Sequence, residues 1–182
     1  SLFSGMNPLA TPPEYLDFVL TDKEGVANTS VVHHGDRLLL LEEGHLPFEM
    51  DPDTLESHGA WSFYGKLNTT MSAHPKVDPN NGDLLFHAYM TAGPFTPDMG
   101  FYRVSADGHM QEAHHFQAPY SAMVHDMVVT ENYVLFPVMP ITGDLARAME
   151  GKPPFAWEPD KPTMVGVMPR GGTPEQIQWI EG

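Results

Sequence analysis

Short apolar runs separated by turn-forming residues recur along most of this chain, and their spacing restricts the fold more than any other feature. The clearest turn signals are Gly35-Asp36, Asn81-Gly82 and Asp107-Gly108, which suit the tight turns of β-hairpins. The runs between turns are rich in β-branched and aromatic residues, as strands are. Many short strands in succession predict an all-β sandwich, barrel or propeller, and periodicity alone does not choose among these folds.

The predicted strands leave little room for helix. They cover 29–34, 37–41, 48–50, 55–64, 71–74, 84–90, 100–104, 110–117, 123–129, 133–137, 163–169 and 176–180. Only segment 142–150 has the apolar spacing of a short helix, and Pro153-Pro154 ends it. Residues 1–24 contain several prolines and no period, so we expect them to cover the sheets.

Composition excludes several classes of function. The 182 residues suffice for one domain with a substantial core, which we assign to 1–182. Nine Lys and Arg against 24 Asp and Glu give a formal net charge of −15, which argues against a nucleic-acid partner. There is no cysteine, so any metal must be held by His, Asp or Glu. Neither a membrane-spanning run nor a signal peptide is recognisable, and we expect a cytoplasmic protein.

Two histidines stand out because each lies where a rigid strand is expected to begin or end. His74 precedes Pro75, and proline restricts the residue before it to extended conformations. His125 precedes Asp126 and a β-branched run about 50 residues further on, roughly the length of one propeller blade. Side chains on such a rigid frame could meet at one metal. Taken alone, each is also explained as a polar residue at a strand end.

The remaining histidines are less distinctive. We interpret six of them as surface residues at or near hairpin turns: His33, His34, His58, His109, His114 and His115. His45 follows an acidic segment and His87 lies in the middle of a predicted strand, and we interpret both as structural rather than as ligands.

Five blocks of this sequence resemble, in the same order, blocks of the carotenoid cleavage oxygenases. The blocks are 27–31, 41–56, 72–79, 125–133 with 136–137, and 166–170. This family includes apocarotenoid oxygenases, lignostilbene dioxygenases and the retinal pigment isomerase. The resemblance implies a seven-bladed β-propeller, of which this chain would supply about four blades, with Fe(II) on its axis bound by four histidines.

In that resemblance, His74 and His125 match the first two iron ligands. Neutral imidazole suits iron, and positions left open at the metal let O2 and an alkene meet beside it. Glutamates orient the ligand imidazoles, and the match places the first of them at Glu43, although Glu42 is one residue away. We expect the two imidazole Nε2 atoms to lie roughly 3 to 4 Å apart, since each would be about 2 Å from one ion.

The implied reaction is the cleavage of a C=C bond of a carotenoid or apocarotenoid by O2, giving aldehyde or ketone products. The implied partners are O2 and an apolar polyene or stilbene-like molecule, with peripheral membrane contact as a further expectation for substrate uptake. In stilbene-cleaving members a lysine directly precedes the first glutamate, whereas this chain has Glu42. Because a carboxylate cannot stabilise a phenolate, we expect a carotenoid substrate rather than a lignostilbene.

Two alternatives and one departure stay open at this point. Within the family, the chain could belong to a lignostilbene dioxygenase, and isomerohydrolase chemistry also fits half a site. From another class, it could be a catalytically inactive β-domain that binds an apolar ligand or a partner. The third and fourth iron histidines have no counterpart here, so we expect an internal part of a longer propeller that binds iron poorly by itself.

Overall fold

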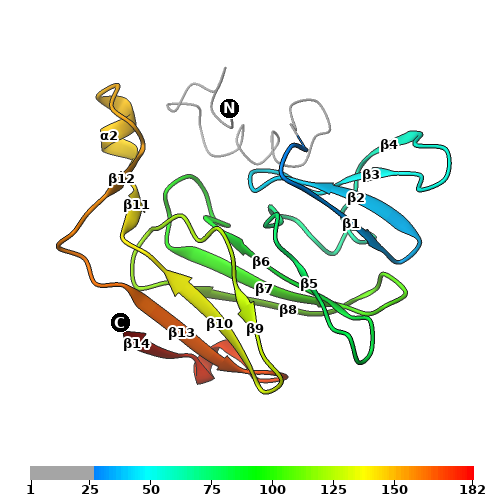
Figure 1. Ribbon diagram of the computed structural model, residues 1–182. Coiled ribbons are helices and arrows are strands. Elements are labelled where there is room, and N and C mark those ends of the chain that lie inside the picture. The colour runs from blue at the N-terminus through cyan, green and yellow to red at the C-terminus, as the bar shows by residue number, and fades with distance from the viewer. Residues whose placement is uncertain (1–26) are drawn as a thin grey trace.

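The structure is a computed structural model in which residues 27–182 are described. Within this range the chain forms three antiparallel four-stranded sheets and one two-stranded sheet (Figure 1). The expected all-β class is confirmed, and the three larger sheets are blades of a partial propeller. The covering role expected for residues 1–24 falls outside the described residues.

The first two sheets are simple meanders, in which each strand pairs with the next one in sequence. The first sheet contains β1 (Ser30–His34), β2 (Arg37–Leu41), β3 (Phe48–Met50) and β4 (Ser57–Ala60). The second sheet contains β5 (Lys76–Val77), β6 (Leu84–Tyr89), β7 (Asp98–Val104) and β8 (Met110–Gln117). Each sheet therefore needs only local connections, as propeller blades do.

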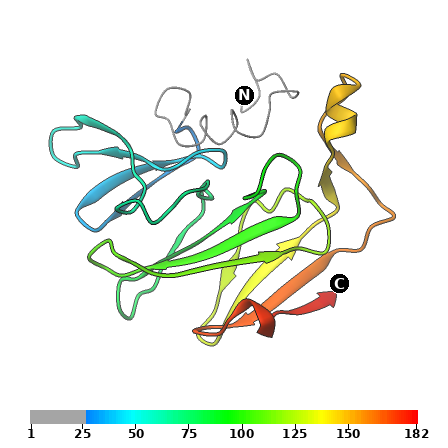
Figure 2. The same cartoon turned by 180° about the vertical axis from the view of Figure 1, so that it is seen from behind.

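The third sheet is interrupted by an excursion. It has the order β14-β13-β10-β9 and contains β9 (Val128–Val129), β10 (Tyr133–Val138), β13 (Met164–Pro169) and β14 (Gln178–Glu181), with a short 3-10 helix, η1 (Pro174–Gln176), before β14. Between β10 and β13 the chain forms β11 (Ile141–Gly143), α2 (Leu145–Met149) and β12 (Phe155–Trp157). Figure 2 shows this excursion projecting from one side of the sheets. About four blades were expected, and the described residues form three four-stranded sheets beside this excursion.

The hydrophobic core lies between neighbouring sheets. One cluster lies between the first and second sheets and includes Leu39, Phe63 and Phe86. The other lies between the second and third sheets and includes Phe101 and Phe136. The second sheet is therefore buried on both faces, which explains why five of the six residues of β6 are buried.

All three expected hairpins are present, and only the first has a two-residue turn. Gly35 and Asp36 join β1 to β2 as a two-residue turn with φ of 57° at both positions, a conformation that glycine and aspartate tolerate. Gly108, at φ 88°, closes the turn between β7 and β8 through a 2.7 Å bond from its N–H to the carbonyl of Ser105. Asn81-Gly82 lies in a wider loop between β5 and β6, which Asp78 and Asp83 close through a backbone hydrogen bond.

Several boundaries differ from the prediction. The strands expected over 71–74 and 123–127 do not form; β5 begins only after Pro75, which has no N–H for pairing. The expected helix is present but shorter, with Asp144 as its N-cap, and β11 and β12 were not predicted. His34, expected at the surface, is only 7% exposed, and its Nε2 lies 3.0 Å from the carbonyl of Gly82. No helix in the described residues is long and apolar enough to cross a membrane.

Candidate metal centre

His74 and His125 meet where the second and third sheets adjoin. Each lies just before the first strand of its sheet, β5 or β9. Their Nε2 atoms are 2.9 Å apart, and their rings cross at 68° with centroids separated by 4.4 Å. The expected approach across 51 residues is therefore present, at a distance slightly shorter than the expected range.

Glu43 lies behind His125. It follows β2 of the first sheet, and its Oε1 contacts His125 Nδ1. Tyr89, at the end of β6, donates a 2.8 Å hydrogen bond to the other carboxylate oxygen of Glu43. Ligand atoms of Glu43, His74 and His125 all lie within 4.8 Å of one another. Each of the three sheets thus supplies one member of the cluster.

The contact from Glu43 determines how His125 can act. A carboxylate accepts a proton donor, so it favours the form of His125 that carries hydrogen on Nδ1 and leaves a lone pair on Nε2. That lone pair faces His74. The 2.9 Å separation suits two nitrogens bound about 2.1 Å from one ion at adjacent positions, and without an ion it suits one N–H···N hydrogen bond. The donor set therefore fits a divalent metal that accepts imidazole.

An ion pair joins the two segments that carry the histidines. Lys76 Nζ donates to Asp126 Oδ1 over 2.8 Å, and the backbone N–H of Met127 also donates to Oδ1. Partial burial acts to raise the pKa of Asp126, but these hydrogen bonds outweigh it and hold the pKa below its usual value. The carboxylate therefore stays ionised and opposite Lys76. A groove of about 680 Å³ runs along this pair, between β5 and β9.

The neighbouring Glu42 contacts a different histidine. Its side chain is buried and contacts Nδ1 of His45, which is buried as well. The structure therefore distinguishes the two adjacent glutamates: Glu43 lies at the candidate centre, and Glu42 belongs to a separate carboxylate–imidazole pair in the first sheet.

His87 is fully buried in β6 and takes part in structure rather than in ligation. Its Nε2 donates to the backbone carbonyl of Val124 over 2.7 Å, and burial lowers its pKa to about 4. The ring is therefore neutral near pH 7. Sequence reasoning did not find Tyr89 or the contacts of His87, because their roles depend on which face of β6 each side chain occupies.

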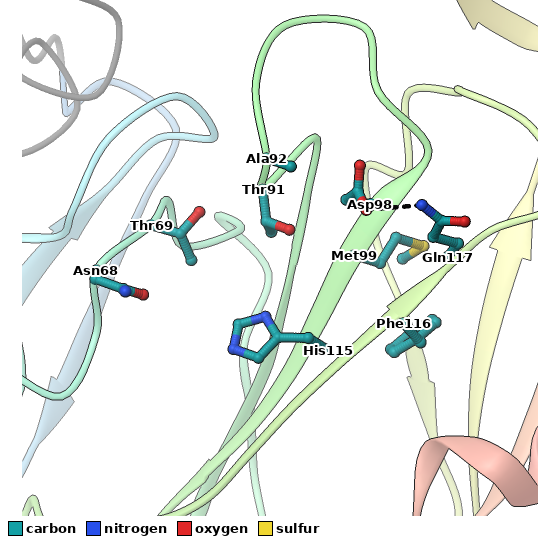
Figure 3. Close-up of a pocket in the computed structure, with 9 residues that line it drawn as sticks. All are labelled: Asn68, Thr69, Thr91, Ala92, Asp98, Met99, His115, Phe116 and Gln117. Atoms are coloured by element: carbon teal, nitrogen blue, oxygen red, sulfur yellow. Dashed lines mark hydrogen bonds between the residues drawn. The ribbon is translucent and has the colours of Figure 1, made fainter. Parts of the chain in front are cut away.

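A second hollow lies away from these residues. Figure 3 shows this pocket, about 650 Å³, where Gln117 donates to Asp98 over 3.0 Å. It is lined by Asn68, Thr69, Thr91, Ala92, Asp98, Met99, His115, Phe116 and Gln117. None of these residues belongs to the cluster of Glu43, His74 and His125, so the pocket does not form part of the candidate centre.

Comparison with known proteins agrees with the early resemblance. Residues 1–182 match the sequence model of a protein family, which is described as retinal pigment epithelial membrane protein. Isoeugenol monooxygenase of Pseudomonas nitroreducens is 41% identical over 157 residues, which cover 86% of this chain and 33% of that protein. Resveratrol cleavage oxygenase 1 of Aspergillus fumigatus is 39% identical over 170 residues, which cover 92% of this chain and 34% of that protein.

Solved structures show the same relationship. Lignostilbene dioxygenase of Pseudomonas brassicacearum superposes with a TM-score of 0.84 and 45% identity, over 88% of this chain and 34% of that one. Cobalt-substituted Synechocystis ACO superposes with a TM-score of 0.77 and 25% identity, over 90% of this chain and 36% of that one. The chain thus spans about a third of the length of these relatives.

Proposed function

Because this chain belongs to the carotenoid cleavage oxygenase family, we propose that the protein containing it is an iron(II)-dependent oxygenase that cleaves a carbon–carbon double bond with O2. The observation that carries the proposal is the 2.9 Å separation of the His74 and His125 Nε2 atoms, with Glu43 behind His125. Two imidazole nitrogens directed at one point are a suitable beginning for an iron site.

The residues of this chain hold and orient the donor nitrogens. Glu43 accepts the Nδ1 proton of His125 and so keeps the Nε2 lone pair available, while the pair of Lys76 and Asp126 ties the two segments together. Bound Fe(II) would supply the activation of O2 that an alkene requires. The overall reaction balances without a reductant: the C=C and O–O bonds break, and two C=O bonds form.

We place an aryl-substituted alkene, such as a stilbene or a propenylphenol, ahead of a carotenoid as the substrate. Relatives named for isoeugenol and resveratrol share 41% and 39% identity, and two named for lignostilbene share 45% and 36%, whereas carotenoid cleavage oxygenase 1 of Neurospora crassa shares 36%. The preference for a carotenoid depended on Glu42. Since Glu42 is buried against His45, its presence is explained by that contact and no longer argues against a phenolic substrate.

The test is O2-dependent cleavage by the full-length protein loaded anaerobically with Fe(II). Isoeugenol, resveratrol and an apocarotenal would be compared, and we expect the two aryl alkenes to be cleaved faster. His74→Ala and His125→Ala should each lose bound iron and activity, while His115→Ala, in the pocket of Figure 3, serves as the matched control. Turnover that survives either ligand variant would contradict the proposal, and faster cleavage of the apocarotenal would return the carotenoid to first place.

The same protein preparation also tests the alternative that this is a catalytically inactive β-domain. A β-domain that only binds an apolar ligand would take up resveratrol or the apocarotenal without iron and would release no carbonyl product. The isolated 182-residue chain is a further comparison. We expect it to bind Fe(II) more weakly than the full-length protein, since a site loses affinity when part of its ligand set and supporting residues is absent.

A further inference from the structure

One face of β6 is directed at the segment that carries His125. Alternate residues of a strand point to opposite faces of its sheet. Leu84, Phe86 and Ala88 belong to the core between the first and second sheets, whereas Leu85 and Tyr89 pack in the core between the second and third sheets. His87 lies between Leu85 and Tyr89 in this alternation. Two polar side chains, His87 and Tyr89, therefore project from the same face of one strand.

His87 connects both histidine segments. Its ring donates to the carbonyl of Val124, the residue directly before His125, over 2.7 Å. Its own backbone carbonyl accepts a 2.9 Å hydrogen bond from the N–H of Ser72, two residues before His74. His87 is thus hydrogen-bonded to the segments beside both candidate ligands, at Val124 and at Ser72.

Tyr89 supports the same ligand from its other side. Its hydroxyl donates to Glu43 Oε2 over 2.8 Å, while Glu43 Oε1 contacts His125 Nδ1. His87 therefore restrains the backbone just before His125, and Tyr89 restrains the His125 ring by way of Glu43. Both restraining side chains, His87 and Tyr89, belong to β6.

A polar ring at a fully buried position needs an explanation, because an apolar side chain would fill the space without a desolvation cost. The exposed fraction of His87 is 0%, and its Nδ1 has no hydrogen-bond partner among the described residues. Its only side-chain hydrogen bond in that part of the chain goes to Val124. The only described hydrogen bond of this buried ring is therefore the one to the Val124 carbonyl, next to His125.

From these contacts we infer that His87 and Tyr89 are positioning residues that fix where the Nε2 atom of His125 points. The inference rests on the proposed function, because it assigns a task to these residues only if His125 is a metal ligand. Neither residue belongs to the group of possible ligands, which is Glu43, His74 and His125. They act through Val124 and Glu43.

Two controls on the same scaffold separate positioning from general stability. His34 is also buried and also bonds a backbone carbonyl, that of Gly82, but this contact lies away from either candidate ligand. Tyr102 is a buried tyrosine on β7 whose hydroxyl has no hydrogen-bond partner among the described residues. His34→Phe therefore matches His87→Phe, and Tyr102→Phe matches Tyr89→Phe.

The experiment titrates the metal-free full-length protein and each variant with Co(II), and records the visible spectrum and the melting temperature. We expect Co(II) affinity to fall about 10- to 100-fold in His87→Phe and in Tyr89→Phe, with an altered spectrum. His87→Gln, which keeps an N–H donor, should recover part of the affinity. The two control variants should keep wild-type affinity and spectrum even where their melting temperature falls.

The outcomes distinguish this inference from the proposed function. Unchanged Co(II) affinity and spectrum in both Tyr89→Phe and His87→Phe, beside a wild-type protein that binds Co(II) tightly, would overturn the positioning role alone. A wild-type protein that binds neither Co(II) nor Fe(II) would overturn the proposed function and this inference with it. If His87→Phe fails to fold, His87→Leu, which also removes the N–H donor, takes its place in this comparison.

Discussion

The two candidate ligands are held in different ways. His125 is held mainly by side-chain contacts, although its own side chain is 56% exposed: Glu43 contacts its ring, and the ring of His87 contacts the carbonyl of the residue before it. The ring of His74 has one hydrogen bond among the described residues, to His125 itself. Its orientation comes from the backbone instead, through Pro75 on one side and the bond from Ser72 on the other. One ligand is therefore fixed by side chains and the other by the main chain.

This difference implies that mutations should act unequally on the two ligands. Side-chain contacts can be removed one at a time, so His125 should be displaced by single substitutions at several positions. The restraint on His74 resides in a proline ring and in backbone hydrogen bonds, which few substitutions remove. The predictions below test this contrast in order of decreasing effect.

The largest of these effects should be a loss of folding stability at low pH, caused by His87, whose ring is hydrogen-bonded to the residue before His125. The pKa of His87 is about 4 in the folded protein against an ordinary value of 6.5, so the unfolded chain binds its proton more readily. The stability that His87 contributes is therefore complete above pH 6.5 and is lost as the pH falls toward 4, by up to about 3 kcal/mol. Urea unfolding of wild type and His87→Phe between pH 7 and 5 measures it. Equal pH slopes in the two proteins would contradict the prediction.

Glu43→Gln should weaken metal binding by about 10- to 100-fold. The amide removes the negative charge that stabilises the Nδ1 proton of His125, while its size is nearly unchanged. Co(II) titration measures the loss. Glu42→Gln is the neighbouring control, since the Glu42 carboxylate contacts His45. An equal loss of affinity in both variants would remove the distinction between the two glutamates.

Pro75→Ala should act on His74 and should have a smaller effect. Releasing the proline restraint increases the conformational freedom of the unfolded chain and costs about 0.4 to 1 kcal/mol. We expect a lowered melting temperature and at most a severalfold loss of Co(II) affinity. A loss as large as that of Glu43→Gln would show that the backbone restraint on His74 matters as much as the side-chain contacts of His125.

The ion pair of Lys76 and Asp126 should matter least, although it joins both segments. The two side chains are 35% and 49% exposed, and such pairs contribute about 0.2 to 1 kcal/mol. A double-mutant cycle with Lys76→Met and Asp126→Asn measures their coupling in Co(II) affinity. The coupling should shrink in 1 M salt, and a coupling that is both large and insensitive to salt would be inconsistent with this account.

The candidate ligands and the adjacent glutamate could be predicted from the sequence, whereas the residues that position them could not. His74 and His125 were identifiable because proline and a β-branched run restrict their surroundings, and Glu43 because it falls within a block that resembles the family. The roles of His87 and Tyr89 were not identifiable. Since β6 is buried on both faces, its residues show no alternation that would assign each side chain to a face.

The wider loop after β5 involves a contact that is distant in sequence. Asn81-Gly82 predicts a two-residue turn from local chemistry alone. In the structure, Asp78 is buried and contacts Arg170 of the segment after β13, and hydrogen bonding from Arg170 lowers the pKa of Asp78. The partner lies 92 residues away in sequence, so no local pattern could have predicted it.

The distribution of the cluster over three sheets gives it a role in chain topology. An ion held by His74 and His125 would close a loop of 51 residues in a protein that has no cysteine in this chain. By the loop-entropy relation used for disulfide bonds, a cross-link of this length restricts the unfolded chain by about 4 kcal/mol. Such an ion would therefore act as a cross-link between the second and third sheets, in addition to the apolar core that already joins them.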